Sequence, residues 1–185
     1  KVVFPADVQR KLDGVRCFAR HEDGKLVLRS RGGDLYDVEH VRASLEDAVP
    51  PGLTLDGELY VHGVPLQEIY SLVKKPQERS KILQFHAYDL FDPDHQEAWD
   101  ARKKWLSEFV DCWQDEHAGD ELVPVVSCEV SNHDEIKLLH DKFVAEGYEG
   151  AMVRNRNGTY RAGFRSADLL KVKAAGLLVP RLSKN

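Results

Sequence analysis

The sequence predicts an α+β fold with largely antiparallel sheets. Two observations lead to this class. Stretches in which apolar and polar residues alternate are interspersed with stretches of helical spacing, and one pair of alternating stretches is joined by a tight turn. The chain has 185 residues, 42% of them hydrophobic, so it can bury a core as one large domain or two small ones. It contains no internal repeat and no low-complexity linker.

The first predicted elements are a hairpin and a helix. Residues 15–20 and 25–30 alternate and flank the sequence "HEDG", in which Gly24 favours a hairpin turn. Residues 37–48 then have the spacing of a short helix, and the Pro-Pro-Gly sequence that follows ends it.

The middle of the chain predicts two further strands and two further helices. Residues 53–63 and 81–92 read as strands, the second ended by an Asp-Pro pair. Residues 65–75 read as a helix with Pro65 at its first position, where proline is favoured. The next helix is indicated by a stripe of apolar residues, which are Trp99, Leu106, Phe109, Val110 and Trp113.

The last part of the chain predicts three strands and one helix. Residues 121–130 read as a strand, and Pro124 moves it towards a sheet edge. Residues 149–155 and 168–173 are the final strands, separated by a loop rich in glycine and arginine. The helix between the strand at 121–130 and the strand at 149–155 is indicated by the apolar stripe Ile136, Leu139, Phe143 and Val144.

Composition excludes several function classes. The net charge of −5 argues against a uniformly basic nucleic-acid coat, and no apolar run reaches the length of a membrane span. The three cysteines lack C-x-x-C spacing, so we expect reduced, mostly buried thiols in a cytoplasmic protein. The eight histidines form no metal-binding motif, so we expect no zinc site.

The cations are unevenly placed, which predicts a phosphate-facing side and an acidic back. The acids concentrate between Asp92 and Glu121. The cations gather in four groups, which are Arg10, Lys11 and Arg16; Arg29 and Arg31; Lys74, Lys75, Arg79 and Lys81; and the run from Arg154 to Lys173. The third group reads as a solvated face, with contact to a DNA backbone as the alternative.

Lys11 lies in the densest of these groups, within "RKLDGVR". One interpretation is a solvated hairpin edge, and the other is a lysine nucleophile among phosphate-binding groups. A lysine attacks only as the neutral amine, and neighbouring cations together with partial burial lower its pKa. Arg10, Arg16, Lys171 and Lys173 could supply that field if the fold brings the two ends of the chain together.

Six short motifs, in order, decide between these interpretations. "KLDGVR" at residues 11–16 resembles the K-x-D-G-x-R signature of the covalent nucleotidyltransferases, which are ATP-dependent DNA ligases, RNA ligases and mRNA-capping enzymes. The later motifs of that family resemble "SRGG" (30–33), "LDGEL" (55–59), "AYDLFD" (87–92), "EGAMVR" (149–154) and "LLKVK" (169–173). The resemblance spans residues 6 to 173 and implies an ATP-grasp-like nucleotidyltransferase domain with mainly antiparallel sheets flanked by helices.

The resemblance implies a role for each residue that matches a motif. Lys11 would attack the α-phosphate of ATP and carry AMP through a phosphoramidate. Asp13 and Arg16 would contact the nucleotide or the DNA end beside it. Lys171 and Lys173 would neutralise phosphates, and Arg10, from the same cation group as Lys11, is included among the nucleotide contacts.

The other implied roles concern the nick, the ribose, the base and the metal. Arg31 would bind the 5′-phosphate of the nick, and Glu58 would accept hydrogen bonds from the ribose hydroxyls. Tyr88 would stack on adenine. Glu149 would help to hold Mg²⁺, and Arg165 is a further phosphate or nucleotide contact.

Some of these residues have a structural alternative. Glu58 could be a strand carboxylate paired across its sheet, and Tyr88 could be a core residue. Glu149 is preferred to Glu146 as the metal ligand because Glu146 precedes a glycine that closes a helix. Gln9 stands where many DNA ligases have a glutamate facing the adenine amino group, and a glutamine oxygen can still accept that hydrogen bond.

The resemblance is strongest to the adenylation domain of small ATP-dependent DNA ligases. We expect residues 1–185 to form that domain, without the OB-fold domain that follows it in the family. The implied partners are ATP and nicked double-stranded DNA, with no membrane, and the protein is expected to be a monomer. The alternatives are an RNA ligase adenylation domain and a nucleotide- or DNA-binding module that has lost catalysis.

Overall fold

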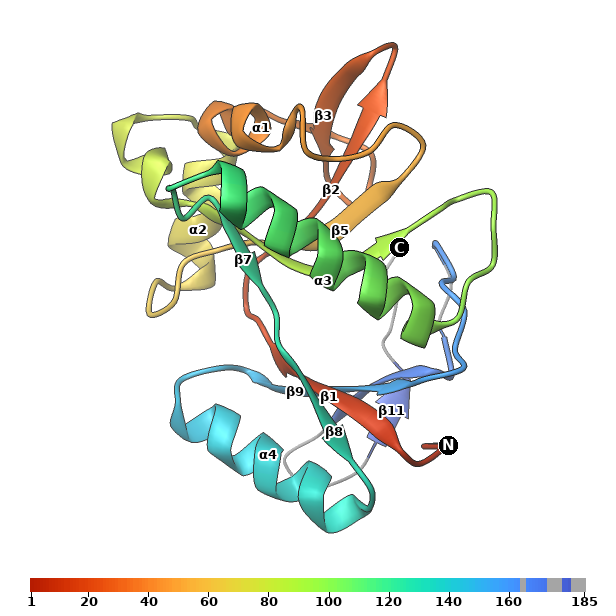
Figure 1. The fold of residues 1–185 in the computed structure, drawn as a ribbon. Helices are drawn as coiled ribbons and strands as arrows, with labels where there is room; N and C mark the ends of the chain where they lie inside the picture. Colours follow the sequence, from red (N-terminus) through yellow and green to blue (C-terminus); the bar gives the residue numbers. More distant parts are fainter. Residues whose placement is uncertain (164–165, 173–177, 181–185) are drawn as a thin grey trace. The chain divides into compact units, whose positions relative to one another are not determined.

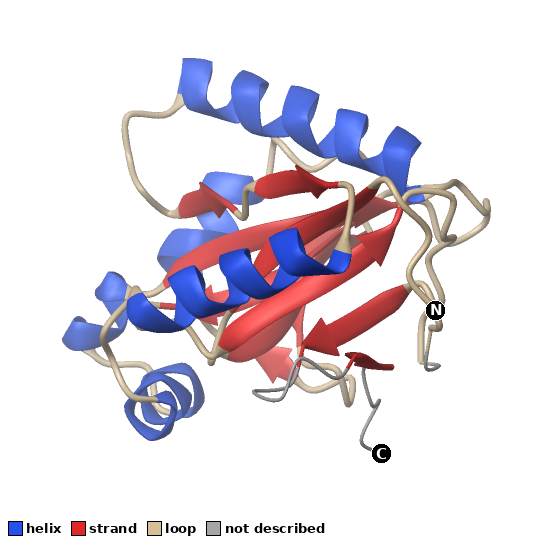
Figure 2. Ribbon diagram, turned by 90° about the horizontal axis from the view of Figure 1, so that it is seen from below, coloured by secondary structure: helices blue, strands red, loops and turns tan. Residues whose placement is uncertain are grey.

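The computed structural model of the chain describes residues 1–163, 166–172 and 178–180 (Figure 1). The chain divides into two compact units. The first unit contains Lys1–Leu12, Gln96–Ala101 and Val125–Asn185, and the second contains Asp13–His95 and Arg102–Pro124. Each unit combines strands and helices, which Figure 2 colours red and blue, so the predicted α+β class is confirmed.

The sheet of the first unit has β1 at an inner position. Its five strands lie in the order β11-β10-β9-β1-β8 and pair antiparallel among the described residues. The sequence patterns had not marked β1 as a strand. The strand bounds are β1 Ala6–Lys11, β8 Ser127–Val130, β9 Gly150–Asn155, β10 Leu169–Val172 and β11 Leu178–Pro180.

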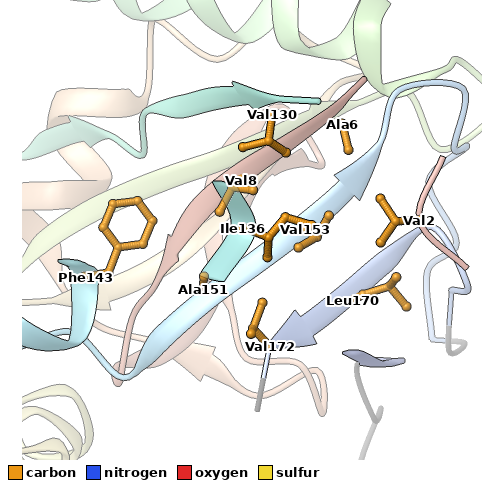
Figure 3. Close-up of a cluster of buried hydrophobic side chains, with 10 residues drawn as sticks. All are labelled: Val2, Ala6, Val8, Val130, Ile136, Phe143, Ala151, Val153, Leu170 and Val172. Atoms are coloured by element: carbon orange, nitrogen blue, oxygen red, sulfur yellow. The ribbon is translucent and has the colours of Figure 1, made fainter. Parts of the chain in front are cut away.

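One face of this sheet is apolar and packs against helix α4 (His133–Ala145). The Asn132 side chain caps α4 by accepting a 2.9 Å hydrogen bond from the Glu135 backbone N–H. Figure 3 shows the side chains that gather in this core, which are Val2, Ala6, Val8, Val130, Ile136, Phe143, Ala151, Val153, Leu170 and Val172. Val144, predicted on the buried stripe of α4, is 48% exposed because it lies one helical step round from the buried Phe143, at the edge of that stripe.

The second unit is built on a sheet of six strands in the order β4-β3-β2-β5-β6-β7 among the described residues. Asp23 (φ 50°) and Gly24 (φ 77°) form the predicted turn between β2 and β3, with the positive φ angles that suit a two-residue hairpin. The strand bounds are β2 Val15–Glu22, β3 Lys25–Arg29, β4 Leu35–Tyr36, β5 Thr54–Tyr60, β6 Gln84–Phe91 and β7 Leu122–Pro124.

The predicted strand 121–130 is two strands that belong to different sheets. β7 is the edge strand of the second-unit sheet and pairs in parallel with β6. β8 instead pairs antiparallel with β1 in the first unit. Pro124 is the last residue of β7, at the sheet edge where a residue without an N–H is tolerated. The edge prediction is confirmed, and the prediction of a single continuous strand is wrong.

A β-bulge interrupts the pairing of β5 with β6. Asp56 faces Asp89 and Gly57 faces Ala87, so Tyr88 is the extra residue on β6. Gly57 lies so close to β6 that a Cβ atom there would be 2.3 Å from the His86 carbonyl oxygen. The glycine of "LDGEL" is therefore required by this close approach of two backbones.

α1 and α2, in the second unit, correspond to two predicted helices, with shorter ends. α1 is Glu39–Leu45, α2 is Leu66–Lys74, and Pro65 occupies the N-cap position of α2 rather than its first turn. The apolar stripe predicted for α3 (Trp99–Glu116) is buried at all five positions. A short 3₁₀ helix, Glu78–Ile82, precedes β6.

The cysteines differ from the expectation of mostly buried thiols. Cys17 is buried, Cys128 is partly exposed and Cys112 is exposed. Cys112 is wrongly predicted because it lies on α3 outside the apolar stripe. In the part of the chain that the structure describes, none of the helices is both long and apolar enough to cross a membrane.

Candidate active site

Lys11 and Glu149 meet at one end of the first-unit sheet. Lys11 is the last residue of β1 and faces Gly150, the first residue of β9. The Glu149 backbone N–H donates to the Lys11 carbonyl at 3.0 Å, and the Glu149 carboxylate forms an ion pair with Lys11 Nζ. The Lys11 side chain is 21% exposed and that of Glu149 is 44% exposed, so both can be reached from solvent.

Gly150 makes this arrangement sterically feasible. Its φ of 152° lies in the region that favours glycine, and a Cβ atom there would be 3.2 Å from Nε2 of the buried His140. The Glu-Gly pair of "EGAMVR" is therefore explained by the backbone, which turns Glu149 towards Lys11 just before β9 begins.

The face of this sheet opposite α4 is polar. Because side chains alternate along a strand, Gln9 lies on the same face of β1 as Lys11. Gln9 faces Met152 on β9, and Met152 in turn faces Lys171 on β10. Gln9, Lys11 and Lys171 therefore belong to one face of one sheet, with Lys171 partly exposed.

A hydrogen-bonded network fixes Gln9. Its carbonyl oxygen accepts from Arg154 Nε at 2.7 Å, and its amide nitrogen donates to Ser127 Oγ at 3.0 Å. The Arg154 guanidinium lies 4.2 Å from the ring centre of Trp99, whose indole N–H donates to Asp7 at 2.8 Å. The sequence patterns gave these partners no part in the site, because strand pairing over long separations brings them together.

Arg10 lies on the other face of β1. Its guanidinium contacts the rings of Phe143 and Tyr148 at 4.9 and 5.1 Å and pairs with Glu146 at 3.1 Å. The expectation that Arg10 joins the nucleotide contacts beside Lys11 is therefore wrong. Successive residues of a strand point to opposite faces, so Arg10 stabilises the packing of α4 instead.

In the second unit, Arg16 is held by a buried carboxylate. Its guanidinium donates to both oxygens of Asp56, at 3.1 and 2.7 Å, and Asp56 is 1% exposed. Arg16 faces Glu58 across the β2–β5 pair, so these two side chains share a face of the sheet. Glu58 is itself 6% exposed and faces His86 on β6.

Burial in this sheet shifts the pKa values of His86 and Cys17. Burial lowers the pKa of His86 to about 4, with a smaller contribution from His62, so the imidazole beside Glu58 is neutral near pH 7. Burial also raises the pKa of the Cys17 thiol, and the Asp56 and Glu58 carboxylates raise it further. Cys17 is therefore a protonated core residue without a nucleophilic role.

The remaining residues predicted for the second unit lie in three settings. Tyr88, at the bulge of β6, is 7% exposed. Asp13 is exposed, and the next residue, Gly14, packs so closely on β5 that a Cβ atom would be 2.7 Å from the Leu59 carbonyl oxygen. Arg31 is exposed in a turn closed by a 2.9 Å hydrogen bond from the Asp34 N–H to Ser30 Oγ.

The predicted residues thus divide between the two units. The first unit holds Gln9, Lys11, Glu149 and Lys171. The second unit holds Asp13, Arg16, Arg31, Glu58 and Tyr88. Arg165 and Lys173 lie outside the described residues.

The sequence family of this chain can now be stated. The ATP-dependent DNA ligase domain matches residues 4–173, which is nearly the whole chain. The chain belongs to this ligase family. A DNA ligase of African swine fever virus (isolate Warthog/Namibia/Wart80/1980) is 33% identical over 174 residues, which cover 90% of this chain and 41% of the viral protein. The chain therefore spans about two fifths of the length of that viral ligase.

Solved ligase structures have the same fold. A Chlorella virus DNA ligase-adenylate superposes with a TM-score of 0.73 at 22% identity, covering 97% of this chain and 62% of the viral one. The ATP-dependent DNA ligase of bacteriophage T7, in complex with ATP, gives a TM-score of 0.67 at 17% identity, covering 95% and 73%. The expected nucleotidyltransferase fold is confirmed.

Proposed function

We propose that this chain is the adenylation domain of an ATP-dependent DNA ligase, in which Lys11 takes AMP from ATP. The observation that supports this most directly is the pairing of Lys11 with Glu149, which are 138 residues apart in the sequence. The pair joins the lysine of "KLDGVR" to the glutamate of "EGAMVR". If Lys11 belonged only to a solvated hairpin edge, a contact with that particular glutamate would not be expected.

In the first step, the Lys11 nitrogen attacks the α-phosphorus of ATP. Nζ releases one proton to solvent water and gives up its ion pair with Glu149, so that it attacks as the neutral amine. Its lone pair forms the N–P bond as the P–O bond to pyrophosphate breaks, and pyrophosphate leaves with that electron pair. The nitrogen then releases a second proton to solvent, which leaves the phosphoramidate. Lys171 and Lys173 neutralise charge on the phosphates, and in-line placement lowers the barrier. The Chlorella virus neighbour is described as a ligase-adenylate and the T7 neighbour as a complex with ATP, in keeping with this step.

Three residues make the nucleoside contacts in this proposal, which are Glu58, Tyr88 and Gln9. Glu58 accepts hydrogen bonds from the ribose hydroxyls, and Tyr88 stacks on adenine. Gln9 has one free lone pair on its carbonyl oxygen, because Arg154 already donates to the other, and it accepts from the adenine amino group. A structural role for Glu58 or Tyr88 would leave ATP affinity unchanged when either is substituted.

The later steps concern nicked double-stranded DNA. AMP passes from Lys11 to the 5′-phosphate of the nick, which Arg31 binds, and the 3′-hydroxyl then displaces AMP to seal the strand. Asp13 and Arg16 contact the nucleotide or the DNA end. Arg16 suits this role because its bidentate pair with Asp56 fixes the guanidinium plane.

Mg²⁺ belongs to the same proposal. The ion binds through one or two carboxylates and substrate phosphates and keeps several waters. Among the described residues no cluster of three metal-ligating side chains occurs, whereas Glu149 offers one accessible carboxylate beside Lys11. Glu149 would therefore hold Mg²⁺, and the bound ion would neutralise phosphate charge.

The decisive experiment is incubation with α-labelled ATP, followed by denaturing electrophoresis. We expect the label to stay on the chain and to be absent from Lys11→Ala, with Lys25→Ala, an exposed hairpin lysine, as the control. No label on the unaltered chain, or label retained by Lys11→Ala, would indicate a binding module without catalysis. Sealing compared on nicked DNA and nicked RNA duplexes tests the choice of DNA ligase over RNA ligase.

The proposal also includes a cytoplasmic monomer. The described cysteines are free thiols, as expected in a reducing compartment. Light scattering after size-exclusion chromatography measures the oligomeric state, and cell fractionation measures the location.

A further inference from the structure

The cations between Lys74 and Lys81 divide into two pairs with different surroundings. Arg79 forms an ion pair with Glu68, and Lys81 forms one with Glu78 at 2.7 Å. Both cations therefore already have a carboxylate partner, on α2 or in the short 3₁₀ helix. Lys74 instead lies 3.7 Å from Asp34, in the turn that begins at Ser30 and contains Arg31.

Two tyrosine rings hold the Lys74 ammonium in place. It lies 5.5 Å from the ring centre of Tyr36 and 5.7 Å from that of Tyr70, both within the range of a cation–π contact. The Tyr70 residue is 52% exposed, and the Lys74 side chain is 36% exposed. The ammonium is therefore fixed at the surface and still accessible to a ligand.

Lys75 extends this positive surface. It is exposed, and among the described residues no carboxylate pairs with it. Lys75 follows Lys74 directly in the chain, and Lys74 reaches the Arg31 turn through its contact with Asp34. All of these residues belong to the second unit. The result is an accessible positive edge that joins the Arg31 turn to the C-terminal end of α2.

We propose that Arg31, Tyr70, Lys74 and Lys75 form a binding surface for the phosphate backbone of duplex DNA, which we call the α2 basic edge. Lysine and tyrosine side chains that contact phosphates position a protein on DNA without reading its sequence. This inference rests on the proposed function, in which Arg31 binds the 5′-phosphate of a nick. It adds that Lys74 and Lys75 bind further phosphates of the same duplex.

The test measures the affinity for a nicked duplex by fluorescence anisotropy across a range of salt concentrations. The double variant Lys74→Ala/Lys75→Ala is compared with Arg79→Ala/Lys81→Ala, which removes the same charge from the same part of the chain. Each phosphate contact contributes about 0.9 to the slope of log affinity against log salt concentration. We expect the first variant to lower that slope by about 1.8 and the second to leave it unchanged.

A third variant tests the role of the tyrosine ring. Tyr70→Ala removes one of the two rings beside Lys74, and we expect it to weaken binding about threefold. Thermal unfolding of every variant shows whether its fold is retained, and Tyr70→Phe keeps the ring should Tyr70→Ala fail to fold.

The two proposals fail in different ways. Equal slopes for the two double variants would overturn the α2 basic edge, because the cluster would then be a diffuse cationic face. A chain that binds no nicked duplex at any salt concentration, while still forming lysyl-AMP, would overturn the DNA step of the proposed function, and this inference with it. An unaltered slope for Lys74→Ala/Lys75→Ala, in a chain that does bind, overturns this inference alone.

Discussion

At the scale of single residues, the direction of a side chain decides its role. Glu146 and Glu149 are both followed by glycine, and only Glu149 contacts Lys11. Glu146 pairs with Arg10, on the face of the sheet that packs against α4. The two glutamates therefore form a natural pair for comparison, one in the proposed site and one outside it.

Glu149→Gln should lower the rate of lysyl-AMP formation about 100-fold, because it removes the carboxylate beside the nucleophile while keeping the shape of the side chain. The rate is measured as labelled chain formed with time at saturating ATP and Mg²⁺. Glu146→Gln is the control and should stay within about twofold of the unaltered chain. Similar losses in both variants would contradict the assignment of Glu149 to the site.

His86 predicts a dependence of stability on pH. Its pKa is about 4 in the folded chain and about 6.5 when unfolded, so the unfolded state binds the extra proton as the pH falls. The free energy of unfolding is therefore highest above pH 6.5. It falls progressively between pH 6.5 and 4, by roughly 3 kcal/mol in total. Urea unfolding at several pH values measures this loss.

His86→Gln keeps a donor for the Gln84 side chain, which His86 contacts at 3.1 Å, and removes the titrating group. The variant should lose most of the pH dependence in this window. The same dependence in the variant would show that another group titrates there.

At the scale of elements, the glycines of the motifs maintain strand contacts. Gly14, Gly57 and Gly150 each lie where a Cβ atom would crowd a neighbouring strand or helix. A motif such as "LDGEL" thus combines a chemical residue, Glu58, with a structural one, Gly57. The bulge opposite Gly57 also explains how Tyr88 can follow Ala87 without continuing the regular pairing.

Gly57→Ala should destabilise the chain by about 3 kcal/mol, because the added methyl group would meet the His86 carbonyl oxygen and the Phe85 ring. The free energy of unfolding in urea measures this change. Gly32→Ala is the control, since its nearest contact would be an ordinary 3.7 Å and its φ is not positive. A Gly57→Ala variant as stable as Gly32→Ala would contradict the close strand approach.

At the scale of the whole molecule, the chain enters and leaves the first unit more than once. β1 comes from the N-terminus, and β8 to β11 come from the C-terminal third. Lys11, Glu149 and Lys171 therefore depend on one sheet that is assembled from distant parts of the sequence. The boundary between the units follows Leu12, the residue directly after the proposed nucleophile.

Phe143→Ala should cost about 3–5 kcal/mol of stability, because Phe143 is 1% exposed within the core under this sheet. Lysyl-AMP formation should fall at temperatures where the variant partly unfolds, since β1 and β9 position both Lys11 and Glu149. Leu138→Ala, on the exposed side of α4 at 70% exposure, should change neither quantity. Circular dichroism and ATP labelling across temperature measure both.

The sequence by itself determined the family motifs, the α+β class, the β2–β3 hairpin and the buried stripe of α3. These follow from local spacing, turn residues and short motifs, which neighbouring residues fix. Only the tertiary structure decided that β1 is an inner strand, that Arg10 and Lys11 point to opposite faces, and that residues 121–130 divide between two sheets. Those features depend on which strands pair across long separations, and periodicity within one segment carries no information about its partner.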